Sequence, residues 1–223
     1  MSKSEQIEKI ELGSNDVKAR FDLPRGEAEG AILLLPGISS GPFGGIFDQF
    51  AEKAKEENFM VMRYESWENL PELQEKTMDS IIKEINEALE YLESLDTERT
   101  YLVAKSFSAG MILAGKIDRA DKITLWAPAI GFQEKSNIEE LREKRLGGID
   151  DVTDIKIDSE YIKQEVPVKI IHGVEDEVVP VANSESIVSG ISEAEIEKLM
   201  ETGHAYEGKE NALIRKTIEF LNQ

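Results

Sequence analysis

Short apolar segments that alternate with helical patterns restrict the fold of this sequence more than any other feature. Strand-like apolar runs occur at 31–35, 59–64, 101–104, 123–126 and 168–171. Runs of this length are typical of strands that are buried on both faces of a sheet. Apolar residues at three- and four-residue spacing lie between most of these runs, most clearly from Leu73 to Leu95, and indicate helices. Strands that alternate with helices form βαβ units, so we predict an α/β protein with a mostly parallel sheet and helices on both faces.

The remaining segments extend this pattern toward both ends of the chain. Two short strands, 7–12 and 17–23, are predicted before the first apolar run, and another strand near 196–200. Further helices are predicted around 47–54, 109–117, 181–188 and 209–221. We see no repeat or linker, so residues 1–223 are expected to form one domain, with 129–165 as a short cap-like insert over the sheet edge.

The composition limits the partners and the chemistry of the chain. Among 223 residues, 45 are Asp or Glu and 26 are Lys or Arg, which gives a formal charge of −19. Such a surface repels phosphate backbones and anionic lipids, so we expect no nucleic acid and no membrane as partners. A charged N-terminal segment and the lack of a long apolar run predict a soluble, cytoplasmic protein. Without cysteine, disulfides, thiolate metal sites and a cysteine nucleophile are excluded.

A serine between a predicted strand and a predicted helix is the first candidate for chemistry. Residues 103–110 read Val-Ala-Lys-Ser-Phe-Ser-Ala-Gly, the context in which a sharp turn lifts a serine nucleophile above a sheet. Ala104 and Ser108 stand at the two crowded positions that usually hold glycine, and both side chains are small. Ser108 is the alternative nucleophile, but that frame would bury the Lys105 ammonium in the sheet. We therefore favour Ser106, although capping of the following helix would also explain either serine.

The chain has only two histidines, which narrows the choice of a general base. A serine nucleophile needs a neutral imidazole that accepts its proton and later returns it to the leaving group. His204 lies in a loop between the last predicted strand and the last predicted helix. His172 ends an apolar strand, and this position favours a hydrogen-bonded, partly buried histidine over the base. Three consecutive carboxylates, from Glu175 to Glu177, lie between the histidines and are candidates to orient the imidazole.

These motifs together resemble the α/β-hydrolase superfamily along nearly the whole chain. The segments that carry the resemblance are 35–37 (Leu-Pro-Gly), 104–108 (Ala-Lys-Ser-Phe-Ser), 125–128 (Leu-Trp-Ala-Pro), 172–180 (His-Gly-Val-Glu-Asp-Glu-Val-Val-Pro) and 203–204 (Gly-His). In this superfamily an H-G-x-x-D-x-x-V-P stretch commonly supplies the acid of a catalytic triad, which implies Asp176. The family order of serine, acid and histidine then implies Ser106, Asp176 and His204 as the triad. The implied architecture is the α/β-hydrolase fold with a minimal cap insert.

The resemblance also implies an oxyanion hole and a reaction. The family uses the backbone N–H of the residue after the nucleophile, here Phe107, and one from the loop after the third strand, here Ile38, with Ser39 as the alternative. The implied activity is that of a small serine esterase, a carboxylesterase-like hydrolase that cleaves an ester or related acyl bond through an acyl-enzyme. Such chemistry needs no metal and no organic cofactor. We expect a small-molecule ester or acyl substrate, and a monomer or homodimer.

The substrate pocket is the least constrained part of the prediction. The loop 39–45 and the insert 129–165 are expected to border it. The candidate lining residues are Ser39, Phe43, Trp67, Ile130 and Phe132, and core packing would explain each apolar one equally well.

Three other hypotheses account for the same residues. The chain could be a non-catalytic binding protein that has the fold of a hydrolase. Thioesterase, peptidase and acyltransferase activities use the same triad, because a fold does not determine one function. A metal-assisted hydrolase would use His172, His204 and Asp176, but two histidines make a poor ligand set.

Overall fold

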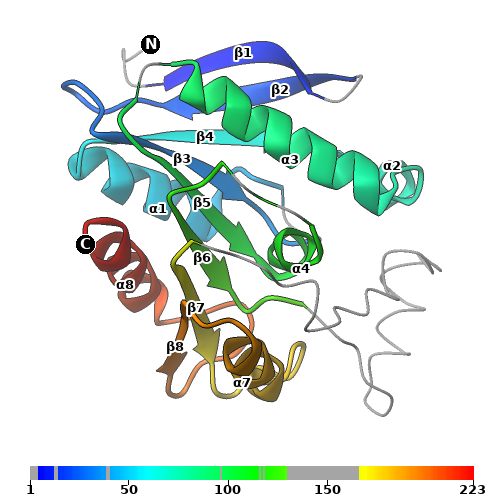
Figure 1. Ribbon diagram of the computed structural model, residues 1–223, viewed down its shortest axis with the longest axis vertical. Coiled ribbons are helices and arrows are strands. Elements are labelled where there is room, and N and C mark those ends of the chain that lie inside the picture. The colour runs from blue at the N-terminus through cyan, green and yellow to red at the C-terminus, as the bar shows by residue number, and fades with distance from the viewer. Residues whose placement is uncertain are drawn as a thin grey trace.

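An eight-stranded sheet forms the centre of the structure, a computed structural model that describes residues 5–12, 15–38, 41–95, 97–115, 117, 119–129 and 166–223 (Figure 1). The strand order is β1-β2-β4-β3-β5-β6-β7-β8. β2 runs antiparallel to its neighbours β1 and β4, and every other adjacent pair is parallel, so the predicted mostly parallel sheet is confirmed. The strands are β1 (Glu5–Leu12), β2 (Asn15–Asp22), β3 (Gly30–Leu35), β4 (Phe59–Glu65), β5 (Thr100–Lys105), β6 (Lys122–Trp126), β7 (Val168–Gly173) and β8 (Ala194–Leu199).

Helices cover both faces of this sheet, as predicted (Figure 1). One face packs against α3 (Met78–Glu93), α4 (Ser106–Ala114) and α7 (Val181–Gly190). The other face packs against α1 (Gly45–Glu56) and α8 (Glu210–Leu221). A short helix, α2 (Leu70–Gln74), precedes α3. The described residues therefore form three layers, with the sheet between two layers of helices.

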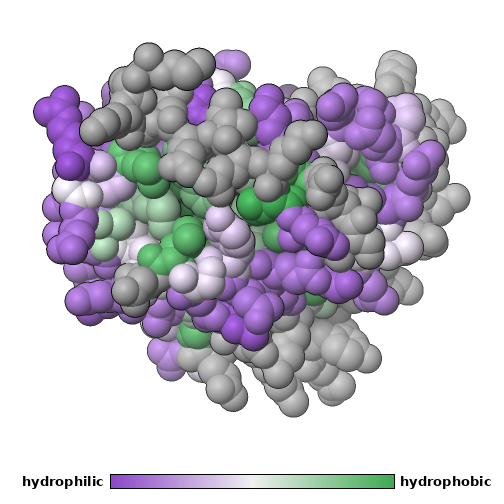
Figure 2. Space-filling view, turned by 90° about the horizontal axis from the view of Figure 1, so that it is seen from above, coloured by the Kyte–Doolittle hydropathy of each residue, from purple (hydrophilic) through white to green (hydrophobic). Residues whose placement is uncertain are grey.

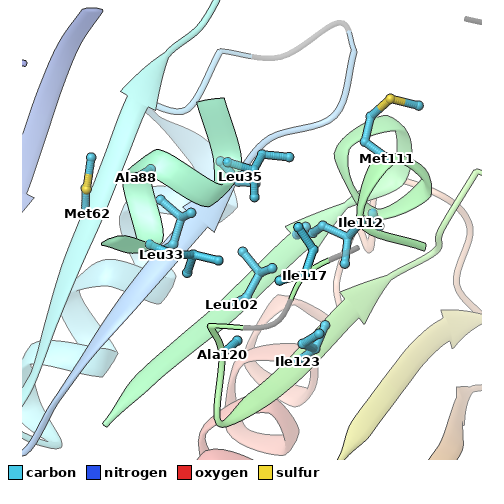
Figure 3. Packing of buried hydrophobic residues seen from close by; sticks show 14 of the residues in the cluster. Leu33, Leu35, Met62, Ala88, Leu102, Met111, Ile112, Ile117, Ala120 and Ile123 are labelled. Atoms are coloured by element: carbon cyan, nitrogen blue, oxygen red, sulfur yellow. The ribbon is translucent and has the colours of Figure 1, made fainter. Parts of the chain in front are cut away.

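The central strands are apolar at successive positions because both of their faces are covered. In β3, Leu33 and Leu35 pack into the cluster on the side of α3 and α4, whereas Ile32 and Leu34 pack into the cluster on the side of α1 and α8. Figure 3 shows Leu33 and Leu35 beside Leu102 of the neighbouring strand β5, below the helices of that face. Successive side chains of a strand point to opposite faces, so a strand buried on both faces reads as an unbroken apolar run.

The helix indicated between Leu73 and Leu95 is confirmed as α3, but it begins at Met78, and Leu73 belongs to the preceding helix α2. The hydroxyl of Thr77 accepts a hydrogen bond from the N–H of Ser80 at 3.1 Å, and the hydroxyl of Ser80 accepts one from the N–H of Thr77 at 3.0 Å. This reciprocal capping satisfies two backbone donors and begins α3 at Met78. Apolar spacing continues across the break, so periodicity alone does not reveal it.

The chain changes direction within the sheet between β3 and β5. From β3 it passes through α1 to β4 on one side, and from β5 it passes through α4 to β6 on the other side. The two strands are adjacent, with Leu35 paired to Ala104. In open α/β sheets a ligand binds beyond the carboxyl ends of the strands at such a point, because the two connections diverge and leave a crevice. A site is therefore expected beside the residues that follow Leu35 and Lys105.

Hydrophilic residues cover much of the surface seen in Figure 2, with hydrophobic residues visible between them. This surface agrees with the 32% of charged residues in the sequence. In the described ranges, no helix is both long enough and apolar enough to cross a membrane. Apart from Ala129, the predicted cap-like insert 129–165 lies outside the described residues.

Candidate active site

Ser106 lies at the turn that joins β5 directly to α4. Its φ angle is +50°, a left-handed conformation that costs a residue other than glycine about 1–3 kcal/mol. β5 ends at Lys105 and α4 begins at Ser106, three residues before the start predicted at 109. No loop separates the two elements, so the direction of the chain changes at Ser106 itself. This geometry is that of a nucleophile elbow, the strained turn that presents a serine above a sheet.

Small residues surround this turn because neighbouring backbone approaches it closely. Ala104 is fully buried, and Ser108 is only 3% exposed. A Cβ atom on Gly110 would lie 2.3 Å from the carbonyl oxygen of Ala129, and the N–H of Ala129 donates to the carbonyl of Ser106 at 3.0 Å. The glycine that this elbow requires therefore stands four residues after Ser106 rather than two.

Ser106, His204 and Asp176 form a continuous chain of hydrogen bonds, although they come from the start of α4, the loop after β8 and the loop after β7. The Ser106 Oγ lies 2.9 Å from His204 Nε2, and His204 Nδ1 lies 2.7 Å from Asp176 Oδ2. Because a carboxylate only accepts, Nδ1 carries the proton, which leaves Nε2 to accept from the serine hydroxyl. Ser108, the alternative nucleophile, lies on α4 and lines the cavity described below. The structure thus brings together the three residues that the resemblance implied.

Asp176 is buried, and both of its oxygens accept hydrogen bonds. Oδ1 accepts from the N–H groups of Val178 at 2.9 Å and Val179 at 2.8 Å, and Oδ2 accepts from His204 and, at 3.1 Å, from His172 Nε2. Burial acts to raise the pKa of this carboxyl, but hydrogen bonds from both histidines, the charge of His204 and the Val179 N–H outweigh it. The pKa of Asp176 is therefore held well below its usual value, and the group is ionised at neutral pH.

His172 is fully buried beside this carboxylate. Its Nε2 faces two acceptors, Asp176 Oδ2 and the carbonyl of Val179 at 2.9 Å, so Nε2 carries the proton. Its Nδ1 accepts from the hydroxyl of Ser184 at 2.6 Å. This geometry agrees with the prediction that His172 is a hydrogen-bonded histidine and not the general base. Its contact with Asp176 was not predicted. No spacing in the sequence indicates this contact, because it depends on the turn that follows β7.

The loop that carries His204 packs closely against the loop that carries Asp176. The N–H of Glu175 donates to the carbonyl of Thr202 at 3.0 Å. A Cβ atom on Gly173 would lie 2.4 Å from that same carbonyl oxygen, so only glycine allows the approach. The backbone itself thereby sets the separation between the acid and the histidine.

Tyr206 anchors the other end of the histidine loop. It is fully buried with φ at +60°, and its hydroxyl donates to the carbonyl of Ile171 in β7 at 2.7 Å. The Lys105 ammonium lies 5.8 Å from the centre of the Tyr206 ring. Burial lowers the pKa of Lys105, and the negative charge of Asp176 acts in the opposite direction. With Ser106 as the nucleophile at the turn, Lys105 is the last residue of β5. The Lys105 ammonium is nevertheless partly buried there.

The two backbone donors proposed for the oxyanion hole lie just beyond the carboxyl ends of the adjacent strands β3 and β5. Because Leu35 pairs with Ala104, Ile38 and Phe107 each stand three residues beyond the paired strand ends. Phe107 is in the first turn of α4, where backbone N–H groups have no partner within the helix. Neither N–H has an acceptor among the described residues. Both are therefore available to a developing negative charge.

A cavity of about 310 Å³ opens next to the elbow. Its lining includes Ile38 from the loop after β3, Ser108 from α4, and Trp67 from the segment after β4. The Trp67 ring meets the Phe107 ring edge to face, with ring centres 5.7 Å apart. The complete lining is Leu35, Pro36, Ile38, Gly41, Pro42, Tyr64, Glu65, Ser66, Trp67, Glu68, Asn69, Ile81, Ile85 and Ser108.

The other residues expected in the pocket lie elsewhere or are not described. Phe43 does not belong to this lining; its ring lies 5.6 Å from the guanidinium of Arg63 and 5.9 Å from the ammonium of Lys18. Phe43 therefore packs over the buried Arg63 of β4 instead of lining the cavity. Arg63 also donates to the carbonyl of Pro42, which keeps the adjacent Phe43 near the guanidinium. Ser39, Ile130 and Phe132 are outside the described residues.

The ligand set of a metal-assisted hydrolase does not form in the part of the chain that the structure describes. No group of three or more His, Asp or Glu side chains there has the arrangement of a metal site. His172 and His204 each direct an N–H group at Asp176 Oδ2, so neither presents a lone pair to a common ion.

Comparisons with known proteins identify the fold. No model of a protein family matches the sequence, and no curated protein matches it. Among solved structures, Est1E from Butyrivibrio proteoclasticus with bound ferulic acid has a TM-score of 0.80 at 15% identity, over 96% of this chain and 97% of that one. A dienelactone hydrolase from Anabaena variabilis has a TM-score of 0.70 at 14% identity, over 97% and 96%.

An alpha-beta serine hydrolase homologue from Coxiella burnetii is similar over 99% of this chain and 98% of its own, at 14% identity and a TM-score of 0.67. Likeness at such identities is a likeness of fold. The sheet order, the single antiparallel strand and the two helical layers agree with it. The chain has the α/β-hydrolase fold, and this prediction is confirmed.

Proposed function

We propose that this protein is a serine hydrolase that cleaves a carboxylic ester or a related acyl bond. The observation that carries the proposal is the pair of hydrogen bonds that joins Ser106, His204 and Asp176, at the turn where Ser106 has a positive φ. A serine held in a strained conformation, against an imidazole whose other nitrogen is bound by an ionised carboxylate, is arranged for nucleophilic attack.

Acylation begins when Ser106 Oγ attacks the carbonyl carbon and its proton passes to His204 Nε2. Asp176 accepts from Nδ1 and stabilises the imidazolium that forms. The electron pair of the carbonyl moves to its oxygen, where the N–H groups of Phe107 and Ile38 would bind the negative charge. Collapse of this intermediate breaks the bond to the alcohol, which takes the proton from His204 and leaves an acyl-Ser106 ester.

Deacylation repeats the sequence with water as the nucleophile. His204 accepts a proton from the water as its oxygen attacks the acyl carbon, and the same two N–H groups bind the new oxyanion. The intermediate then releases the acid, and Ser106 recovers its proton from His204. Acyl chemistry is also supported by the names of structural neighbours, which include a serine hydrolase homologue and a dienelactone hydrolase.

A fluorophosphonate probe combined with a panel of p-nitrophenyl esters tests the proposal. We expect the probe to label the wild-type protein at Ser106, as located by mass spectrometry of the modified peptide. Ser106→Ala should abolish labelling and lower kcat by about 10³-fold or more, because the nucleophile is gone. Ser108→Ala is the matched control, and it should still be labelled at Ser106.

Two results would contradict the proposal in different ways. A protein that takes up no probe and cleaves no ester would be a binding protein with this fold. Loss of labelling in Ser108→Ala, with full activity in Ser106→Ala, would assign the nucleophile to the other serine.

A further inference from the structure

The cavity beside the elbow has apolar walls and a small volume. Leu35, Ile81 and Ile85 contribute to its lining together with the Trp67 ring. Its volume of about 310 Å³ is at the lower end of the range for small-molecule sites. A single substituted ring or a short branched chain suits this space, whereas a long acyl chain does not.

Tyr64 brings one unused polar group to this cavity. The residue is 3% exposed, lines the cavity, and its hydroxyl has no hydrogen-bond partner among the described residues. Burial, with the nearby charges of Glu84 and Glu87, raises the pKa of Tyr64 well above its usual value, so the hydroxyl stays neutral. The Tyr64 hydroxyl is not one of the fully enclosed side-chain atoms that lack a partner, so it stays open to the cavity, where a ligand oxygen can take the place of water.

The charged groups in the described lining of the cavity are all acidic. Glu65 and Glu68 belong to its described lining, which contains no Lys, Arg or His. Glu84, just beyond the wall, is paired with Lys76 and accepts from the hydroxyl of Ser66, so these neighbouring groups are already occupied. An anionic ligand would meet two carboxylates and no described cation in the lining, which opposes its entry.

We propose that this cavity binds one arm of the ester, an uncharged group about the size of one ring that carries an oxygen able to hydrogen-bond to Tyr64. The proposal rests on the hydrolase function proposed above and specifies its substrate class. Substrates whose corresponding arm bears a carboxylate are excluded by the same lining. Tyr64 is thus a specificity-determining residue rather than a member of the triad.

Binding can be measured without turnover in Ser106→Ala, through the fluorescence of Trp67. The chain has two tryptophans, and the other one, Trp126, is fully buried in the core. The probes are four amides of 3-phenylpropanoic acid: the unsubstituted one, the 3-hydroxy and 4-hydroxy ring derivatives, and the 4-carboxy derivative. We expect the better hydroxy ligand to bind about fivefold more tightly than the unsubstituted one, as one added hydrogen bond implies. The carboxylate should bind at least about tenfold more weakly than the unsubstituted ligand.

Tyr64→Phe in the same Ser106→Ala background is the decisive variant, because it removes the hydroxyl and keeps the ring. In it the hydroxy and unsubstituted ligands should bind equally well. A hydroxy preference that persists, tight binding of the carboxylate, or the absence of binding by all four amides would overturn the proposal. Hydrolysis of p-nitrophenyl acetate by the wild-type protein is scored separately, so a failure of the cavity is distinguishable from a failure of the hydrolase function.

Discussion

The two sides of the elbow differ in how their polar groups are satisfied. On the acid side, which comprises the loops after β7 and β8 with Asp176 and His204, both carboxylate oxygens and both ring nitrogens of the buried His172 have partners. The exception among the described residues of these loops is the buried hydroxyl of Thr202, which has no partner. On the cavity side, which comprises the end of β4, the segments after β3 and β4 and the start of α4, the Tyr64 hydroxyl and the N–H groups of Ile38 and Phe107 have none among the described residues.

This contrast separates two requirements of the hydrolytic site that we propose. The acid side has to hold an imidazole in one orientation, and filled hydrogen bonds and close backbone contacts achieve that. The cavity side has to receive a ligand, so its donors remain available until one arrives. Substitutions on the acid side should therefore cost activity and stability, whereas those on the cavity side should mainly alter which substrate is bound.

The largest expected effect comes from Asp176→Asn. An amide can donate to His204 Nδ1, which would favour the tautomer that cannot accept the serine proton, and kcat should fall by about 10⁴-fold. Glu175→Gln and Glu177→Gln are matched controls on the same loop, since both side chains are exposed. The measurement is kcat for ester hydrolysis by the three variants. An equal loss of kcat in either control would show that Asp176 is not the carboxylate that orients His204.

Next in size is the effect of adding a methyl group where the two loops of the acid side meet. Gly173→Ala would drive a Cβ atom into the carbonyl of Thr202, so the free energy of unfolding should fall by about 3 kcal/mol. In Gly41→Ala, on the cavity side, the added Cβ atom would lie no closer than 3.8 Å to a neighbouring atom. The free energy of unfolding should therefore change by less than about 0.5 kcal/mol. Urea unfolding followed by circular dichroism compares the two; similar losses would argue against the difference in packing between the two sides.

A smaller effect is expected in the stability of the protein in acid. Because the pKa of Asp176 is lowered in the folded state, its ionised form stabilises the fold above about pH 4, the usual pKa of an unfolded aspartate. That contribution is lost as the pH falls through the folded pKa. Between pH 5 and pH 2 the free energy of unfolding should therefore decrease more steeply in the wild-type protein than in Asp176→Asn. Parallel pH profiles would mean that the carboxylate is not stabilised by folding.

The smallest effect concerns His172→Leu, which removes the N–H donor that a glutamine amide would keep. Loss of the His172 N–H donor leaves the Asp176 carboxylate less stabilised, so it attracts the His204 imidazolium more strongly. The acid limb of kcat/KM should move to higher pH by about half a unit to one unit, as the loss of one hydrogen bond implies. Ser184→Ala, which removes the partner of the other ring nitrogen, should move it less. An unchanged limb with a lower kcat would limit His172 to a structural role.

The fold could be predicted from the sequence because its strands are buried on both faces. β3 and β5 are recognisable without any neighbour in view, since almost every position is apolar, and their alternation with helices leaves few topologies. His204 was identified because histidine is scarce, and Asp176 because the segment 172–180 resembles a family motif. For Ser106 the position between a strand and a helix left Ser108 as an alternative, and the choice depended on the burial of Lys105 and on the family resemblance.

The cavity could not be predicted in the same way, because it depends on which side chains lack partners. Tyr64 reads as an ordinary core residue of β4, and nothing in its neighbours indicates an unpaired hydroxyl. Phe43 was expected in the pocket from its loop, but the buried Arg63 attracts its ring instead. The contact of His172 with Asp176 likewise arises from the shape of the turn after β7 rather than from residue types.

The bond between Ser106 and His204 joins residues that are 98 positions apart in the chain, and this distance has a consequence for refolding. Contacts between distant residues form late, because a long loop has to close first. Helices and β-hairpins can form after dilution from denaturant while the segment from β7 to α8 is still undocked. The recovery of catalytic activity would therefore lag behind the recovery of the circular-dichroism signal. The rate at which activity returns would measure the docking of the segment from β7 to α8.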